Sequence, residues 1–277
     1  MTLPPSLCDR SALLRNRARA KRQGADYFLH EMAAGEIEER LSEVNKSFTS
    51  AAVVTGFPEP WHALLPEAKF VSDSDVLDLE AGAHDLIIHA LALHWANDPV
   101  GQMVQCRRAL KPDGLFIAIM FGGQTLAELR AALAAAESRI SGGLSARVLP
   151  MGEIRELGAL LQRAGFALPV ADTVTQKASY ATLFHLVADL RAMGEGNALA
   201  RRSRRIAPRT LFPEAAAIYA AEYPAPDGRI VATFDMIHLT GWAPDPSQQQ
   251  PLRPGSAAQR LADALGTEET PVSRLGD

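Results

Sequence analysis

The fold is decided by residues 84–125, which read HDLIIHALALHWANDPVGQMVQCRRALKPDGLFIAIMFGGQT. Residues 85–93 form a nearly continuous apolar run, which is typical of a strand buried on both faces of a parallel sheet. Asp98 and Pro99 place an N-cap residue before a proline at the first helical position, so they predict the start of a helix. Residues 115–120 form a second apolar run. Strand, helix and strand together predict one right-handed crossover of an α/β protein.

Further segments predict the elements on both sides of this crossover. Residues 9–44 are helical in pattern, with predicted breaks near Gly24 and Gly35. Residues 111–114, Lys-Pro-Asp-Gly, predict a turn because proline presets φ and glycine tolerates unusual conformations. Apolar or alternating segments predict strands over 51–55, 69–71, 166–174 and 229–240. Helices are predicted over 125–139, 151–164, 180–193 and 212–223.

Composition and charge exclude several classes of function. The 277 residues carry a formal net charge of −4, which gives no global attraction to nucleic acid or to an anionic membrane. Cys8 and Cys106 are far apart and lack metal-ligand spacing, so we expect reduced thiols and no metal site. No apolar run is long enough to cross a bilayer, and the first residues lack the apolar core of a secretion signal. We therefore expect a cytoplasmic protein without a transmembrane segment.

Several separated motifs carry a family resemblance. LALHWANDP and RRALKPDGLFIAIMFGGQTLAELR resemble class I S-adenosylmethionine (SAM)-dependent methyltransferases. The resemblance is closer to the branch that contains malonyl-carrier-protein O-methyltransferases and methyltransferase-type assembly factors of respiratory complex I. It also covers LCDRSALLRNRARAK (7–21), MGEIRELGALLQRAGF (151–166) and GWAPDPSQQQPLRPGSA (241–257). Because it begins at residue 7, we interpret the Arg-rich start as folded protein rather than as a mitochondrial presequence.

The resemblance implies a Rossmann-like SAM-methyltransferase sheet whose last strand is antiparallel to its neighbour. We expect an N-terminal helical segment over 1–48 and an α/β domain over 49–241 with a helical lid inserted at about 176–225. A largely irregular tail would follow over 242–277, with one short helix near 257–265. Between Gly56 and His84 the chain is about 20 to 30 residues shorter than a full core, as judged from usual βαβ lengths. This predicts a sheet shortened at one edge, and it leaves open whether residues 69–71 are the family's second or third strand.

The resemblance also implies a cofactor site at the carboxyl ends of the strands. Gly56 and Asp73 would contact SAM, and Ala90 and Leu91 would line its methionine end. Asp73 follows a predicted strand, where an acidic residue often accepts ribose hydroxyls, but a loop aspartate that caps a turn explains it equally well. The turn after residues 51–55 reads Thr-Gly-Phe-Pro-Glu-Pro, so one glycine remains of the family's glycine-rich motif. Its prolines remove N–H donors, and Phe57 adds bulk where the cofactor should lie.

His94 is a candidate general base because histidine titrates near neutral pH and His94 lies at the end of a predicted strand. A packed histidine beside Trp95 is the alternative. The sequence contains no G-x-S-x-G, H-E-x-x-H or Walker motif. In the resembling enzymes the cofactor carries the reactive methyl group, so a catalytic triad is not required. Glu195 and Asn197 either face a substrate from the lid or belong to a glycine-rich helix end.

Two clusters of basic residues are candidates for partner surfaces. Residues 15–22 contain four arginines and a lysine, and they either dock an acidic partner or RNA or form a solvated helix face. No aromatic residues for base stacking are interleaved with them, which favours the solvated face. Arg201, Arg202, Arg204 and Arg205 present the same choice between an acidic protein partner, RNA and a solvated loop.

Two hypotheses of function follow. The first is a SAM-dependent methyltransferase that acts on a carrier-bound acid or a protein side chain. The alternative is a non-catalytic or altered-activity assembly factor, of the respiratory complex I type, that has lost SAM binding. The altered turn at Gly56 and the shortened segment before His84 are the features that separate them.

Overall fold

The computed structural model describes residues 6–248. By the density of internal contacts the chain divides into residues 1–244 and 245–277, and the first unit holds all the helices and strands described below. The helix expected near residues 257–265 and most of the motif at 241–257 lie outside the described residues.

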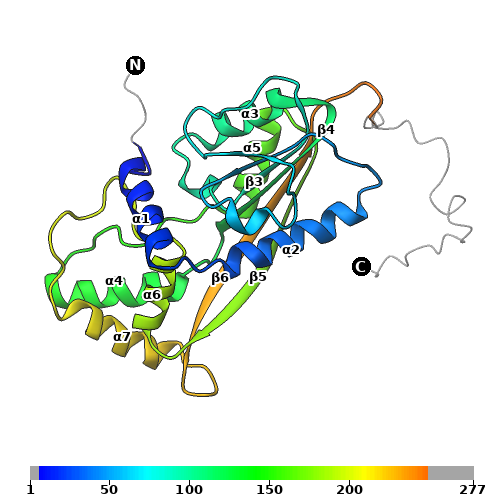
Figure 1. Ribbon diagram of the computed structural model, residues 1–277. Helices are drawn as coiled ribbons and strands as arrows, with labels where there is room; N and C mark the ends of the chain where they lie inside the picture. Colours follow the sequence, from blue (N-terminus) through cyan, green and yellow to red (C-terminus); the bar gives the residue numbers. More distant parts are fainter. Residues whose placement is uncertain (1–5, 249–277) are drawn as a thin grey trace, which may run out of the picture. The chain divides into compact units, whose positions relative to one another are not determined.

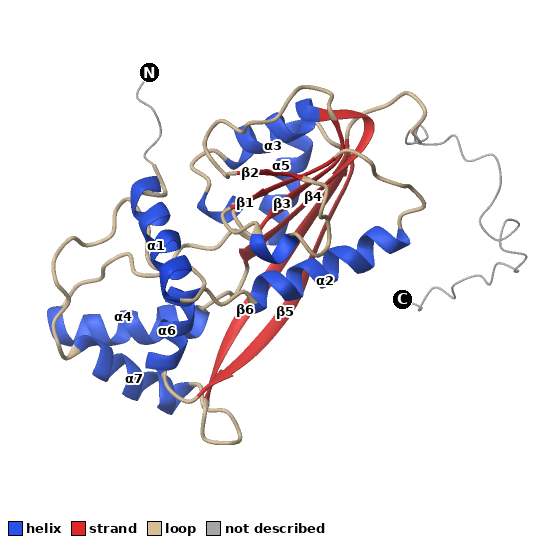
Figure 2. Ribbon diagram, viewed as in Figure 1, coloured by secondary structure: helices blue, strands red, loops and turns tan. Residues whose placement is uncertain are grey.

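A six-stranded mixed sheet organises this unit (Figures 1 and 2). Its strands lie in the order β2-β1-β3-β4-β6-β5. Strands β2, β1, β3 and β4 are parallel, and β6 is antiparallel to both β4 and β5. The predicted α/β class and the antiparallel last strand are thereby confirmed. The strands span Ala51–Thr55 (β1), Lys69–Val71 (β2), His84–Ala90 (β3), Leu110–Gly122 (β4), Ala167–Tyr180 (β5) and Ile230–Trp242 (β6).

Helices cover both faces of the sheet. Leu29, Ala33 and Ile37 of α2 are buried with one set of alternating strand residues, and α3 and α5 are buried with the other set. Helices α4, α6 and α7 gather beyond the carboxyl end of β4, next to α1 (Figure 1). The helices span Arg10–Gln23 (α1), Phe28–Glu43 (α2), Pro99–Ala109 (α3), Ala127–Ser141 (α4), Ile154–Ala164 (α5), Leu183–Ala192 (α6) and Leu211–Glu222 (α7).

Local sequence signals explain where several helices begin and end. The Asp98 side chain accepts a 2.7 Å hydrogen bond from the Gly101 N–H and caps α3, as the Asp98-Pro99 pair predicts. Asp9 caps α1 in the same way through the Ala12 N–H. Helix α5 ends at Gly165, whose φ of 84° is in the left-handed region.

Two local predictions are wrong. Gly35 does not break α2, because a glycine inside a helix costs only about 1 kcal/mol and the buried face of α2 outweighs that cost. Residues 111–114 do not form a separate turn, because β4 continues through them. The pairing of β3 with β4 shifts its register there, and Asp113 takes a φ of 58°, so the segment is an irregularity within the strand.

The sheet is shortened at the edge formed by β2. Only a three-residue 3-10 helix, Glu59–Trp61 (η1), lies between β1 and β2, and residues 72–83 contain no helix or strand. The sheet therefore ends at β2, which is three residues long. β2 pairs directly with β1, with Lys69 opposite Ala52, so it is the strand next to the first one in this sheet.

Candidate functional site

The turn after β1 is closed by aromatic packing. Thr55 Oγ1 accepts a hydrogen bond from the Phe57 N–H at 3.2 Å. Phe57 is only 2% exposed, and its ring centroid lies 5.6 Å from that of Tyr27 and 5.5 Å from that of His30. Since η1 contains Pro60 and follows Pro58, no full helix presents free N–H groups here, unlike the glycine-rich turns that hold nucleotides.

Asp73 lies just beyond β2 and is held by two arginines of α1. Its Oδ1 accepts a 2.7 Å hydrogen bond from Arg17 Nη1, and its Oδ2 accepts one of 3.0 Å from Arg10 Nη1. Arg10 Nη2 also donates to the Asp73 carbonyl at 2.8 Å. Burial alone would raise the pKa of Asp73, but the two guanidinium groups outweigh burial and hold that pKa well below its usual range. Asp73 is 1% exposed and charged, so it is an ion-pair anchor in this arrangement.

Arg17 covers the single glycine of the turn. A Cβ built on Gly56 would lie 2.3 Å from the Arg17 Cζ, so the guanidinium occupies the space that this glycine leaves open. Gly194, at the end of α6, packs closely against Phe57 and Arg17. A Cβ built on it would lie 2.7 Å from the Phe57 ring and 3.1 Å from Arg17 Cγ. Arg17 is 4% exposed.

These residues, as arranged, do not fit SAM. Both oxygens of the acidic residue at the strand end are used by arginines, and a guanidinium lies on the glycine that should approach the cofactor. A pocket of about 330 Å³ remains beside them, lined by Thr55, Gly56, Phe70 and Asp73 among others. Arg17 and Asp73 both form part of its wall, so the pocket lies beside their ion pair.

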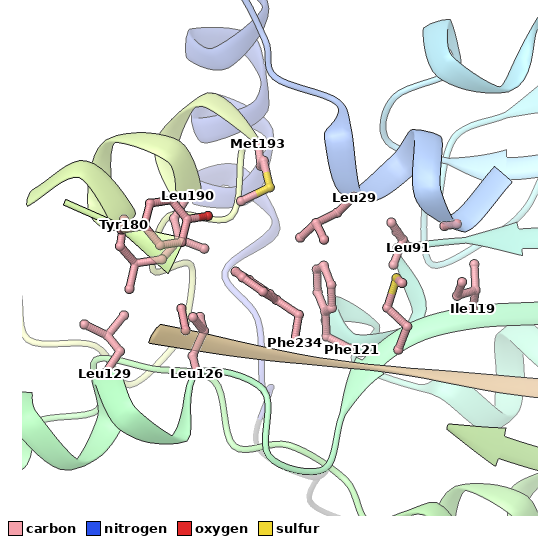
Figure 3. Packing of buried hydrophobic residues seen from close by; sticks show 14 of the residues in the cluster. Leu29, Leu91, Ile119, Phe121, Leu126, Leu129, Tyr180, Leu190, Met193 and Phe234 are labelled. Carbon is pink, nitrogen blue, oxygen red and sulfur yellow. The ribbon is translucent and has the colours of Figure 1, made fainter. Parts of the chain in front are cut away.

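Ala90 and Leu91 are 0% and 2% exposed at the carboxyl end of β3. They belong to the apolar core that also contains Leu29 of α2, and Figure 3 shows Leu91 beside this core. Leu91 has a φ of 44°, an unusual conformation for a leucine, which redirects the chain from β3 into the 3-10 helix Leu93–Trp95 (η2). The structure thus brings Gly56 and Asp73 together around Arg17, whereas Ala90 and Leu91 lie in packed core.

A second pocket, of about 200 Å³, lies between the carboxyl end of β4, α4 and α6. Its walls are mostly apolar. Figure 3 shows the rings of Phe121 and Phe234 next to each other, with Leu190 and Met193 across from them. His94, Trp95 and Glu195 also line this pocket.

Glu195 is the carboxylate of this pocket, which Arg147 and Arg191 also line. Trp95 Nε1 donates a 2.7 Å hydrogen bond to Glu195 Oε2, and His94 Nε2 lies 3.3 Å from the same oxygen. No residue among those described donates to the other oxygen, Oε1. Burial alone would raise the pKa of Glu195, but His94, Arg17 and the hydrogen bond from Trp95 lower it below its ordinary value. Glu195 is therefore a carboxylate in an apolar pocket.

The other histidine near the strand ends is placed differently. His89 is fully buried, and its Nε2 is 2.8 Å from Gln102 Oε1. Burial lowers the pKa of His89 to about 4, so it is neutral at pH 7 and part of the core. His94 is the histidine that lines the pocket, where it contacts Glu195 and packs against Phe121 with ring centroids 4.9 Å apart. Within the described part of the chain, no group of three or more potential ligands is arranged for a metal ion.

The two basic clusters separate into buried and exposed arginines. In α1, Arg17 is buried, while Arg15 and Arg19 are exposed. In the loop 199–206, Arg202 and Arg204 both pair with Asp9, at 2.9 and 3.1 Å. No helix in the described residues is long and apolar enough to cross a membrane.

Comparisons with known proteins agree with this fold. Residues 62–118 match the family described as methyltransferase domain. The chain is 37% identical over 206 residues to a protein of Rattus norvegicus named arginine-hydroxylase NDUFAF5, mitochondrial, which covers 74% of this chain and 60% of that protein. It is 31% identical over 184 residues to the malonyl-[acyl-carrier protein] O-methyltransferase of Laribacter hongkongensis, covering 66% of this chain and 59% of the relative. The chain thus spans about three fifths of the length of these relatives.

Among solved structures, a methyltransferase-like protein of Bacillus halodurans superposes with a TM-score of 0.49 at 11% identity, covering 76% of this chain and 98% of that one. The YcgJ protein of Bacillus subtilis gives the same TM-score and identity, with 78% and 100% coverage. These comparisons show a match to the methyltransferase-domain family over residues 62–118 and sequence similarity to the NDUFAF5 arginine hydroxylases and the malonyl-[acyl-carrier protein] O-methyltransferases.

Proposed function

We propose that this chain is an altered-activity member of its family, which binds an arginine side chain of a partner protein in the pocket that contains Glu195. The observation that carries the proposal is a carboxylate with one unpartnered oxygen in an apolar pocket. An arginine side chain has matching chemistry, because its stem is apolar and its guanidinium forms strong hydrogen bonds with carboxylates. The relatives named arginine hydroxylases support arginine as the partner group.

The size of the pocket supports a side chain rather than a whole small molecule. Its volume is about 200 Å³, whereas pockets for drug-sized ligands measure about 300–1,000 Å³. Phe121 and Phe234 would contact the stem of the bound arginine, and Glu195 Oε1 would accept from its guanidinium. Trp95 and His94 fix the carboxylate by holding Oε2.

Calorimetric titration with a five-residue peptide, a central arginine flanked by alanines, tests this proposal. We expect the peptide to bind and its citrulline counterpart, which is uncharged, to bind much more weakly. Glu195→Gln should weaken binding by about 1.5–3 kcal/mol, the usual value of a hydrogen bond to a charged group. Glu222→Gln, a change at an exposed glutamate of α7, should have no effect. Equal affinity for the arginine and citrulline peptides would rule out Glu195 as the recognition group.

For the partner we propose a protein subunit of a respiratory complex, as the resemblance to assembly factors suggests. The nearly neutral charge of the whole chain and the pairing of Arg202 and Arg204 with Asp9 favour a protein over RNA. Co-purification with the respiratory subunits tests this, and their repeated absence would remove its support. We also propose a cytoplasmic location, since Cys8 and Cys106 are free buried thiols.

The second candidate is SAM-dependent methyl transfer to a carrier-bound acid or a protein side chain, which the methyltransferase domain and the carrier-protein methyltransferase relatives favour. In this proposal Gly56, Asp73, Ala90 and Leu91 would contact SAM, and His94 would act as a base. It requires both arginines to leave Asp73, which is why we place it second. Calorimetry with SAM that gives no heat at millimolar concentration would argue against it.

A further inference from the structure

Helix α1 is attached to two parts of the fold at once. On one side Arg10 and Arg17 bind Asp73 beyond β2. On the other side Asn16 Nδ2 donates to the Gly196 carbonyl at 2.9 Å, and the Asp9 N–H donates to the Ala198 carbonyl at 2.8 Å. The helix therefore bridges the ends of the first strands and the loop that carries Glu195.

Arg17 occupies the centre of this bridge. Its guanidinium fills the space over Gly56, and its Cγ would contact any Cβ at Gly194. The Cζ also lies 6.0 Å from the centroid of the Phe57 ring, within range of a cation–π interaction. A ligand and this side chain cannot share that space, because the gaps are already at contact distance.

We propose that α1 is an autoinhibitory element whose Arg17 and Arg10 hold Asp73 and block the nucleoside end of the ligand site. A ligand that uses Asp73 enters only when these arginines leave. The closed state is favoured because a buried carboxylate that loses its cationic partners is strongly destabilised. A pocket of about 330 Å³ that Arg17, Gly56 and Asp73 line supports the proposal, since it places open space beside the carboxylate that the arginines hold.

This inference goes beyond the proposed arginine binding and does not depend on it. Arginine binding concerns Glu195 and is measured with a peptide, whereas the blocking element concerns Asp73 and is measured with a nucleoside. Either can fail without the other. The two sites share α1, because Asn16 holds the loop that carries Glu195.

The test is calorimetric titration of the full chain with S-adenosylhomocysteine. We expect Arg17→Ala to bind it at least about tenfold more tightly than the unmodified protein, because apparent affinity scales with the fraction of open molecules. Arg19→Ala is the matched control, since Arg19 lies on the exposed side of α1, and it should bind as the unmodified protein does. Equal affinities for Arg17→Ala and the unmodified protein, or no binding by either, would overturn the proposal.

Two further variants complete the experiment. Adding Asp73→Asn to Arg17→Ala should remove the gain in affinity, because ribose hydroxyls would lose their carboxylate acceptor. If the gain remains, the ligand binds elsewhere and the proposal is wrong. If thermal melting shows that Arg17→Ala does not fold, the titration is made on Arg10→Ala, whose side chain is more exposed, at 18%. Tighter binding than the unmodified protein supports the proposal, and an equal or weaker affinity overturns it.

Discussion

Arg17 and Asp73 form a buried ion pair across 56 residues of sequence, with 2.7 Å between Nη1 and Oδ1. Their side chains are 5% and 1% exposed. The pair joins the N-terminal helix α1 to the segment that follows β2 at the edge of the sheet. Asp73 therefore has a structural role as the counter-charge of two arginines of α1.

Removing Asp73 should be strongly destabilising. Asp73→Ala leaves the buried guanidinium of Arg17 without a counter-charge, so we expect the free energy of unfolding to fall by about 3–5 kcal/mol. Urea unfolding measures this. The exposed pair of Lys69 with Asp78 is the control, because Asp78→Ala should cost less than about 1 kcal/mol. The double variant Asp73→Ala with Arg17→Ala should be more stable than Asp73→Ala alone; additive losses would show that the pair is not coupled.

Two glycines should respond in opposite ways to the same substitution. Gly56→Ala places a Cβ against the Arg17 guanidinium, so we expect a loss of about 1–3 kcal/mol as that side chain is displaced. Gly35→Ala, in the middle of α2 with no atom within 4 Å of the added Cβ, should gain about 0.5–1 kcal/mol. Thermal or urea unfolding of the two variants decides this. A neutral Gly56→Ala would show that Arg17 moves aside at no cost.

Stability should depend on pH through His30. Burial lowers the pKa of His30 to about 4, and its Nδ1 accepts a 3.2 Å hydrogen bond from Trp61 Nε1, which requires the neutral ring. An unfolded histidine has a pKa of about 6.5, so between pH 6.5 and 4 the unfolded state binds more protons than the folded state. The free energy of unfolding therefore decreases as the pH is lowered through this range. We expect His30→Gln, whose amide oxygen still accepts from Trp61, to show a smaller loss over this range. An unchanged pH profile would assign the effect to His89 and the other buried histidines.

Asp73 should affect the free energy of unfolding at a lower pH than His30 does. Its folded pKa is depressed, so the stability it contributes is present above its unfolded pKa of about 3.9 and is lost as the pH falls below that value. We expect the difference in unfolding free energy between the unmodified protein and Asp73→Asn to shrink between pH 4 and pH 2. A difference that stays constant down to pH 2 would mean that Asp73 is not charged in the folded protein.

The sheet and most helices were predictable because their apolar periodicity is local. Residues 85–93 and 115–120 indicated buried parallel strands, and Asp98-Pro99 indicated the start of α3. The path of residues 111–114 was not predictable from the sequence, because turn residues inside a strand produce the same pattern as turn residues in a loop. Whether such residues bend the chain depends on the neighbouring strands, which a single segment does not reveal.

The candidate site was less predictable because it depends on contacts between distant segments. Asp73 was placed at a strand end, yet its partners Arg10 and Arg17 belong to a helix whose charges resemble a solvated face. Arg15 and Arg19 do form such a face. For Glu195 the sequence left two interpretations, a residue facing a substrate from the lid or part of a glycine-rich helix end. Its contacts with Trp95 and His94 span 100 or more residues of sequence. Only the folded chain brings these groups together.

A crystal structure of the full chain grown with millimolar S-adenosylhomocysteine would show directly whether Arg10 and Arg17 keep the ligand away from Asp73. We predict that Arg17 Nη1 stays within hydrogen-bonding distance of Asp73 wherever α1 is in place, with no adenosyl group on that carboxylate. A ribose bound to Asp73 while both arginines keep their present positions would contradict it.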